Sequence, residues 1–134
     1  MSLPGKDDYI KYRLERAHET YGVAKLLVDN KAWNSTVNRL YYAAYYAISA
    51  LLIKSDVPTK THAGVKTQFL LHFIKPGKID LDYGKVYADL FDWRQKGDYG
   101  DFFDFKEEDV LSVLEPTLSL IREVERLIHS DEEE

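Results

Sequence analysis

Apolar residues recur along this chain at alternating spacings of three and four, the pattern of one buried face on an α-helix. The first such run predicts a helix from about residue 7 to residue 30, with apolar positions at Ile10, Leu14, Ala17, Tyr21, Ala24 and Val28. Similar runs predict helices over about 33–54, 62–74 and 80–96. A last helix is expected to begin with the acidic residues Glu107, Glu108 and Asp109, which suit the positive end of the helix dipole.

These helices predict the fold class, because no segment alternates with period two for long enough to form a sheet. The expected fold is all-α, an up-and-down helical bundle of four long helices plus a short one. With 134 residues the chain fits a single domain, 1–134, with an ordered core over about 7–128. An apolar fraction of 45% and a charged fraction of 31% are those of a globular protein.

Composition and charge exclude several classes of protein. The chain has no cysteine, which excludes disulfides and thiol nucleophiles. No apolar run is long enough to cross a membrane and no signal peptide is visible, so no membrane association and a cytoplasmic location are expected. The net charge of −5 argues against a strongly basic nucleic-acid binder. Residues 54–78 nevertheless carry five lysines against one aspartate, a charge distribution that suits a polyanion or a complementary partner.

One charged residue occupies a core position of the fourth predicted helix. The apolar face of that helix is formed by Tyr83, Val86, Tyr87, Leu90 and Phe91. At about 100° per residue, Arg94 falls at the centre of this face. A guanidinium does not lose its charge and is costly to bury without a partner. The position therefore predicts that a carboxylate, a second subunit or an anionic ligand meets Arg94.

The second predicted helix has two distinct faces. One is a stripe of small and apolar residues that allows another helix to approach closely: Leu40, Ala43, Ala44, Ala47 and Leu51. The adjoining face carries Arg39, Tyr42 and Tyr46. Tyrosines pack their rings and pair their hydroxyls, so this face is either the wet side of a central helix or a polar site shared with Arg94.

Several motifs together resemble the HEPN domain family (higher eukaryotes and prokaryotes nucleotide-binding) over roughly residues 7–128. They are Trp33, Val37, Arg39, the run from Tyr41 to Tyr46, Thr61-His62-Ala63-Gly64-Val65, Phe69, and Arg94 followed by Asp98-Tyr99. The resemblance is to a poorly characterised prokaryotic branch with Arg-x-x-x-Asp-Tyr. It implies a helical bundle, usually a homodimer, often encoded beside a minimal nucleotidyltransferase.

The same resemblance implies a site. Many HEPN proteins are metal-independent endoribonucleases with an Arg-x4-6-His motif at the dimer interface, and Arg94 matches that arginine. No histidine follows Arg94 at this spacing. The candidate catalytic residues are therefore Arg94, Asp98 and His62. Asp98 can act as a base or can pair with Arg94 four residues away. His62 either reaches the same cleft or only caps and packs the start of its helix.

Three functions follow from this pattern. The first is a nucleotide- or RNA-associated partner of a minimal nucleotidyltransferase in a toxin–antitoxin-like or defence module. Its ligand-binding residues would be Arg39, Tyr42, Tyr46, Arg94 and Tyr99. The second is an endoribonuclease toxin that replaces the missing histidine, and the third is a non-catalytic dimeric interaction module held by an Arg94–Asp98 salt bridge. The resemblance also makes Tyr99 the candidate for AMP addition by the partner enzyme.

A metal site is not expected. Glu15 and His18 have the Glu-x-x-His spacing of a di-iron ligand pair, but such a site needs a second motif of the same kind. Glu125 and His129 have a different spacing. The sequence therefore predicts neither a metal nor a cofactor.

Overall fold

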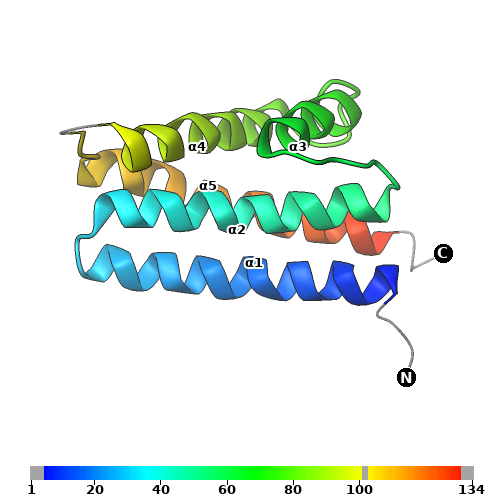
Figure 1. Cartoon of the computed structure of the whole chain (residues 1–134), viewed down its shortest axis with the longest axis horizontal. Helices are drawn as coiled ribbons and strands as arrows, with labels where there is room; N and C mark the ends of the chain where they lie inside the picture. The colour runs from blue at the N-terminus through cyan, green and yellow to red at the C-terminus, as the bar shows by residue number, and fades with distance from the viewer. Residues whose placement is uncertain (1–4, 101–102, 131–134) are drawn as a thin grey trace.

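Helix α2, residues Trp33–Lys54, contacts every other α-helix of a bundle in which all described elements are helical (Figure 1). The structure is a computed structural model that describes residues 5–100 and 103–130. The other elements are α1 (Lys6–Asp29), α3 (His62–Phe69), the π-helical turn η1 (Leu70–Ile74), α4 (Leu81–Tyr99) and α5 (Glu107–His129). These elements confirm the prediction of an all-α fold.

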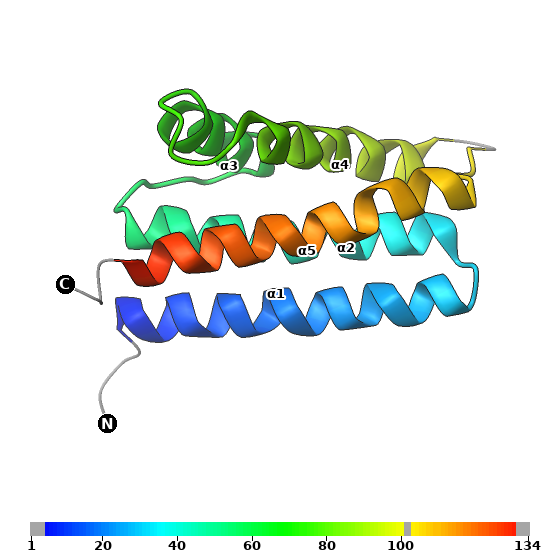
Figure 2. The same ribbon diagram turned by 180° about the vertical axis from the view of Figure 1, so that it is seen from behind.

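Consecutive long helices run antiparallel. Figure 1 shows α1 and α2 side by side, with α4 and α3 along another side of α2. Figure 2 shows α5 on the opposite face of the bundle, where it packs against α2. The start of α1 and the end of α5 lie at the same end of the bundle. No helix in the described part of the chain is both long and apolar enough to span a membrane.

The predicted apolar faces form the core. On α1, the predicted positions from Ile10 to Ala24 are buried and only Val28 is partly exposed. On α2, the predicted stripe from Leu40 to Leu51 is at most 2% exposed. The alanines of this stripe leave room for a neighbouring backbone, which explains why α2 can sit between α1, α4 and α5.

Two predicted boundaries differ from the structure. The expected helix over 62–74 divides after Phe69, where Lys75 N donates to Leu70 O (2.8 Å) in the five-residue spacing of a π-helical turn. The expected end of α4 at Gly97 is wrong, because the helix continues to Tyr99. Gly97 serves packing instead, since a Cβ there would lie 3.1 Å from Cε2 of Phe105. The residue at which α4 ends is Gly100, where a Cβ would lie 2.6 Å from Lys96 O.

Candidate functional site

Tyr41 lies at the centre of the candidate site, where the tyrosine run of α2 meets α4. Its side chain is fully buried. Its ring contacts those of Tyr42, Tyr45, Tyr87 and Phe91, with centroid distances between 5.1 and 6.2 Å. The aromatic cluster so formed gives the charged residues around it flat π-faces on which to lie.

Arg94 is met by these aromatic faces. Its guanidinium carbon lies 4.8 Å from the ring centroid of Tyr41 and 5.8 Å from that of Tyr42. Nη1 donates to the Tyr42 hydroxyl over 3.4 Å, which is long for a hydrogen bond. Nε is buried and has no hydrogen-bond acceptor among the described residues. A cation held by ring faces keeps its charge. Of the partners expected from the sequence, a carboxylate does not pair with Arg94 among the described residues.

Arg39 is the second guanidinium at the site. It lies 5.1 Å from the centroid of the same Tyr42 ring and donates to Oδ1 of Asn38 from Nε (3.0 Å) and Nη2 (2.6 Å). The amide of Asn38 in turn donates to both carboxylate oxygens of Asp98, at 3.1 and 3.3 Å. A polar chain therefore connects α2 with the end of α4.

These hydrogen bonds change one of the two roles expected for Asp98, that of an ion-pair partner of Arg94. Within the described residues no ion pair joins Asp98 to Arg94, although the four-residue spacing permits one. Arg94 turns instead toward Tyr41 and Tyr42, and Asp98 accepts from Asn38. The carboxylate is thus connected to Arg39 through an amide.

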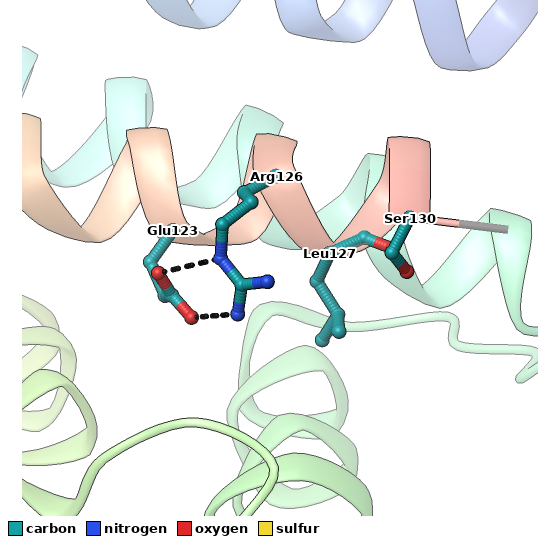
Figure 3. A network of polar contacts seen from close by, with 4 residues as sticks. All are labelled: Glu123, Arg126, Leu127 and Ser130. Atoms are coloured by element: carbon teal, nitrogen blue, oxygen red, sulfur yellow. Dashed lines mark hydrogen bonds and ion pairs between the residues drawn. The ribbon is translucent and has the colours of Figure 1, made fainter. Parts of the chain in front are cut away.

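Some basic residues elsewhere have carboxylate partners. On α5, Nε and Nη2 of Arg126 donate to the two oxygens of Glu123 at 3.1 and 2.5 Å (Figure 3). On α4, Lys85 pairs with Asp89 at 2.9 Å. Arg39 and Arg94 have no such partner among the described residues. Two positive charges therefore converge on Tyr42 without compensation by a carboxylate, an arrangement that favours an anion.

A pocket of about 310 Å³ lies where α2 meets the ends of α1 and α4. It is lined by Leu27, Asn34, Ser35, Asn38, Arg39, Gly97 and Asp98. Arg94 and Tyr42 are not among the lining residues, and within one chain Arg39 and Arg94 are related through the ring of Tyr42, which both contact. The volume is within the range of small-molecule sites, and the lining holds a cation, a carboxylate and two amides.

His62 approaches the same cluster from the first turn of α3. Its Nδ1 lies 2.7 Å from the Tyr41 hydroxyl, and its ring stacks on Tyr45 with centroids 4.5 Å apart. The capping role belongs to the preceding residue, since Thr61 Oγ1 accepts from Gly64 N at 2.8 Å. His62 is therefore a neighbour of Arg94 through Tyr41, as one of its two predicted roles requires.

Burial sets the protonation of the His62–Tyr41 pair. Burial lowers the pKa of His62, and the nearby positive charge of Arg94 lowers it further. Burial also raises the pKa of Tyr41 to about 12. A neutral imidazole and a protonated phenol fit a hydrogen bond from the Tyr41 hydroxyl to Nδ1. We assign the ring proton of His62 to Nε2 accordingly, which makes this atom a donor.

The lowered pKa of His62 predicts a pH dependence of stability. The unfolded chain takes up a proton at about pH 6.5, and the folded chain resists protonation at that pH. The stabilisation is complete above about pH 6.5 and is lost below it, as the pH falls through the lower pKa of the folded state. We expect His62→Gln to reduce the loss of urea stability between about pH 7.5 and 5.5. Equal losses in the wild type and the variant would contradict this assignment.

The other predicted ligand residues are divided. Tyr46 belongs to the cluster, since its ring lies 6.2 Å from that of Tyr42 and under the guanidinium of Arg16 at 5.7 Å. Tyr99 is 78% exposed and lines a separate shallow hollow on α4. The structure thus brings Arg39, Tyr42, Tyr46, Arg94 and His62 into one region, and Asp98 joins it through Asn38.

Sequence reasoning gave no role to two residues of this site. Asn38 stands directly before Arg39, and an amide next to a charged residue carries no periodic signal. Tyr41 is one of four tyrosines in six residues, and its four-residue spacing from Tyr45 was the available sign that both rings face the same neighbours. Their partners, Asp98 and His62, are distant in sequence, so only the folded chain reveals them.

A metal-binding constellation is not formed by the described residues, in which no group of three or more histidine, aspartate or glutamate side chains is suitably placed. His18, which has di-iron-like spacing from Glu15, lies 3.1 Å from Oε1 of Glu125. This contact joins α1 to α5.

Comparison with known proteins gives the family. The HEPN domain profile matches residues 10–127. A UPF0332 protein of Thermotoga maritima is 38% identical over 123 residues, which are 92% of this chain and 93% of that protein. From Methanocaldococcus jannaschii, "Putative toxin MJ0605" is 37% identical over 100 residues (73% and 75%) and "Putative toxin MJ0142" is 27% identical over 96 residues (72% and 65%). The chain belongs to the HEPN domain family.

Proposed function

We propose that this chain binds a nucleotide, free or within RNA, in the pocket lined by Arg39 and Asp98. One observation carries the proposal: Arg39 lines this pocket without a carboxylate partner in the described chain, and Arg94 adds a second unneutralised charge at the Tyr42 ring. Arginine suits a phosphate because its planar donors match two phosphate oxygens.

The remaining pocket groups suit the other parts of a nucleotide. The carboxylate of Asp98 is able to accept a hydrogen bond from a ribose hydroxyl. The amide of Asn38 is already bonded to Arg39 and Asp98, so it holds these two charged groups in place beside the ligand. A purely inorganic anion would use only the arginine, so the carboxylate favours a ligand that carries hydroxyls together with a phosphate.

The toxin names of two relatives support a role in a toxin–antitoxin-like module. We place the chain there as a homodimer whose partner is a minimal nucleotidyltransferase. In this proposal the nucleotidyltransferase transfers AMP to Tyr99, whose phenol is exposed. Its oxygen would bond to the α-phosphorus of ATP as the bond to the β-phosphate oxygen breaks. Pyrophosphate would leave, and the phenolic proton would pass to a base of the partner enzyme.

Binding should appear as heat stabilisation of the purified protein by nucleoside monophosphates and triphosphates. The matching nucleosides, which lack the phosphate, should stabilise it much less. Arg39→Gln should remove most of the nucleotide effect, because Arg39 is the only basic side chain among the described residues that line the pocket. Arg122→Gln is the matched control, since it makes the same change in net charge at an exposed position of α5.

The outcomes separate the alternatives. Equal stabilisation of Arg39→Gln and the wild type by nucleotides would contradict this site. An endoribonuclease is the second candidate, favoured by the contact of both His62 and Arg94 with Tyr41. It requires cleavage of RNA in the presence of a chelator. The assigned protonation supports binding more than cleavage, because Nδ1 of His62 is already occupied and a general base needs a free lone pair.

A further inference from the structure

A separate pocket lies toward the far end of α2, between α1 and the connection that leads from α2 to α3 (Figure 1). Its volume is about 220 Å³. Three apolar side chains form part of its wall, and its polar lining residues are Arg13, Tyr45, Ser49, Thr59, Lys60 and Thr61. Of the lining residues that the structure describes, none carries a carboxylate. The pocket therefore combines two positive charges with four hydroxyl groups.

The hydroxyl of Ser49 has no protein partner. Ser49 is 8% exposed, and its Oγ makes no hydrogen bond to any described residue. A hydroxyl on a helix often donates to the carbonyl four residues earlier, as Thr36 does at 2.8 Å and Thr117 at 2.6 Å. Ser49 does not, although a buried hydroxyl without a partner costs free energy. Because Ser49 lines the pocket, a ligand there can supply the missing partner.

The two basic residues of the pocket keep their charge. Neither Arg13 nor Lys60 has a salt-bridge partner in the described part of the chain. Asp56 is the acidic residue nearest to Lys60 in the sequence, and it pairs with Lys6 at 2.8 Å. Two cations among hydroxyl donors, without a carboxylate to neutralise them, favour a multiply charged oxyanion.

Antiparallel packing of α1 on α2 brings Arg13 opposite Ser49. The guanidinium of Arg16 lies 5.7 Å from the ring centroid of Tyr46. Three residues toward the start of α1 and three toward the end of α2 lead from this contact to Arg13 and Ser49. The ion pair between α1 and the segment after α2 has the same register, because its residue numbers also add to 62. Both side chains line the pocket, and no hydrogen bond joins them. A ligand between them would contact both.

We propose that this pocket binds a phosphate group, either inorganic phosphate or the phosphate of a small monoester. The planar fork of Arg13 matches two phosphate oxygens, the ammonium of Lys60 supplies a second positive charge, and Ser49 donates its unpaired hydroxyl. Thr61 Oγ1 accepts from Gly64 N and keeps its own proton to donate. The volume is below the roughly 300 Å³ at which small-molecule pockets begin, so it suits a phosphate better than a whole nucleotide.

The inference goes beyond the proposed function, because this pocket shares no lining residue with the nucleotide pocket. It is nevertheless connected to His62. Lys60 and Thr61 directly precede this histidine, and the ring of Tyr45 stacks on it with centroids 4.5 Å apart. A phosphate held between Arg13 and Lys60 would join α1 to the start of α3. The ligand would thereby hold His62 in its place beside the aromatic cluster.

Inorganic phosphate is the first probe, with sodium chloride of equal ionic strength as the reference. Phosphate should raise the unfolding temperature of the full chain more than chloride does. Arg13→Gln should weaken the phosphate affinity by roughly tenfold or more, whereas Arg122→Gln, the same change at an exposed position of α5, should not. Arg39→Gln should keep the phosphate effect. Equal stabilisation of Arg13→Gln and the wild type would overturn the proposal, because a general salt effect acts on both alike. A phosphate effect lost only in Arg39→Gln would also overturn it and would leave the nucleotide site standing.

Ser49→Ala separates binding from stability. Without phosphate it should be at least as stable as the wild type, because the hydroxyl that it removes has no partner. Its phosphate affinity should fall by roughly tenfold. Ser112→Ala, at an exposed position of α5 where Oγ donates to Asp109 O at 2.6 Å, should leave the affinity unchanged. Loss of stability in Ser49→Ala with unchanged phosphate affinity would contradict the site. A comparison with glycerol phosphate identifies the source: tighter binding than phosphate indicates a monoester, and weaker binding indicates inorganic phosphate.

Discussion

Replacement of Arg94 by alanine is expected to weaken nucleotide binding by roughly 10- to 100-fold. A charge-assisted hydrogen bond contributes about 1.5–3 kcal/mol, and each 1.4 kcal/mol corresponds to about tenfold in affinity. Arg94 does not line the pocket, so this effect requires the bound phosphate to extend past Arg39 to the Tyr42 ring, where Arg94 has no carboxylate partner among the described residues. Titration calorimetry of the variant with a nucleoside triphosphate measures the loss.

The fold should survive this change. The lost cation–π contacts with Tyr41 and Tyr42 destabilise the variant by about 0.5–2 kcal/mol, and removal of the buried Nε, which has no acceptor, offsets part of that. Arg94→Lys should bind with intermediate affinity, because an ammonium keeps the charge and loses the planar fork. Arg122→Ala is the control for net charge. An Arg94→Ala protein that binds as tightly as the wild type would restrict Arg94 to a structural role.

Replacement of Phe69 by alanine is expected to give the largest loss of stability, about 3–5 kcal/mol. Phe69 is fully buried at the end of α3, where its ring meets Tyr87 of α4 edge-on at 5.8 Å and Phe73 at 6.4 Å. The cavity left behind would separate α3 from α4. Because natural domains are stable by only about 5–15 kcal/mol, urea unfolding should show a strongly lowered midpoint.

Leu71→Ala is the matched control for Phe69→Ala. Leu71 is two residues further along, in η1, and is 49% exposed. Its truncation should change the free energy of unfolding by less than about 1 kcal/mol. His62 is also in α3. We therefore expect the stability of the Phe69→Ala variant, under conditions in which it is still folded, to lack the pH dependence assigned to His62. Similar effects of the two variants would show that α3 is not anchored through Phe69.

The missing histidine of the arginine motif acquires a structural context. Arg94 does not lack a histidine neighbour: His62 arrives from α3 and contacts the same Tyr41 ring. It lies in another helix from Arg94, is bound through Nδ1 to a buried phenol and has a lowered pKa. A histidine held neutral in this way is a better hydrogen-bond donor to a phosphate than a proton acceptor.

Periodicity alone determined the helical fold of this protein. The apolar positions of α1 and the alanine stripe of α2 are local patterns. Their burial follows directly, because an apolar helix face is removed from water only when it packs against another element. The unusual placement of Arg94 on an apolar face was equally visible. The ends of the helices were less predictable. Gly97 was expected to terminate α4, but it packs against Phe105, which lies in the segment between α4 and α5.

Tertiary structure decided what meets each charged or polar group. A spacing of four permitted Arg94 and Asp98 to pair. In the folded chain Arg94 contacts the rings of Tyr41 and Tyr42 instead, and Asp98 accepts a hydrogen bond from Asn38. The sequence could not show which partner is preferred. An exposed ion pair and an exposed cation–π contact contribute similar free energies, and burial changes each of them by more than the difference between them. Burial is a property of the assembled helices. The order of residues along this chain therefore determines its helices and their inward faces, and only their packing determines which ligand chemistry remains open.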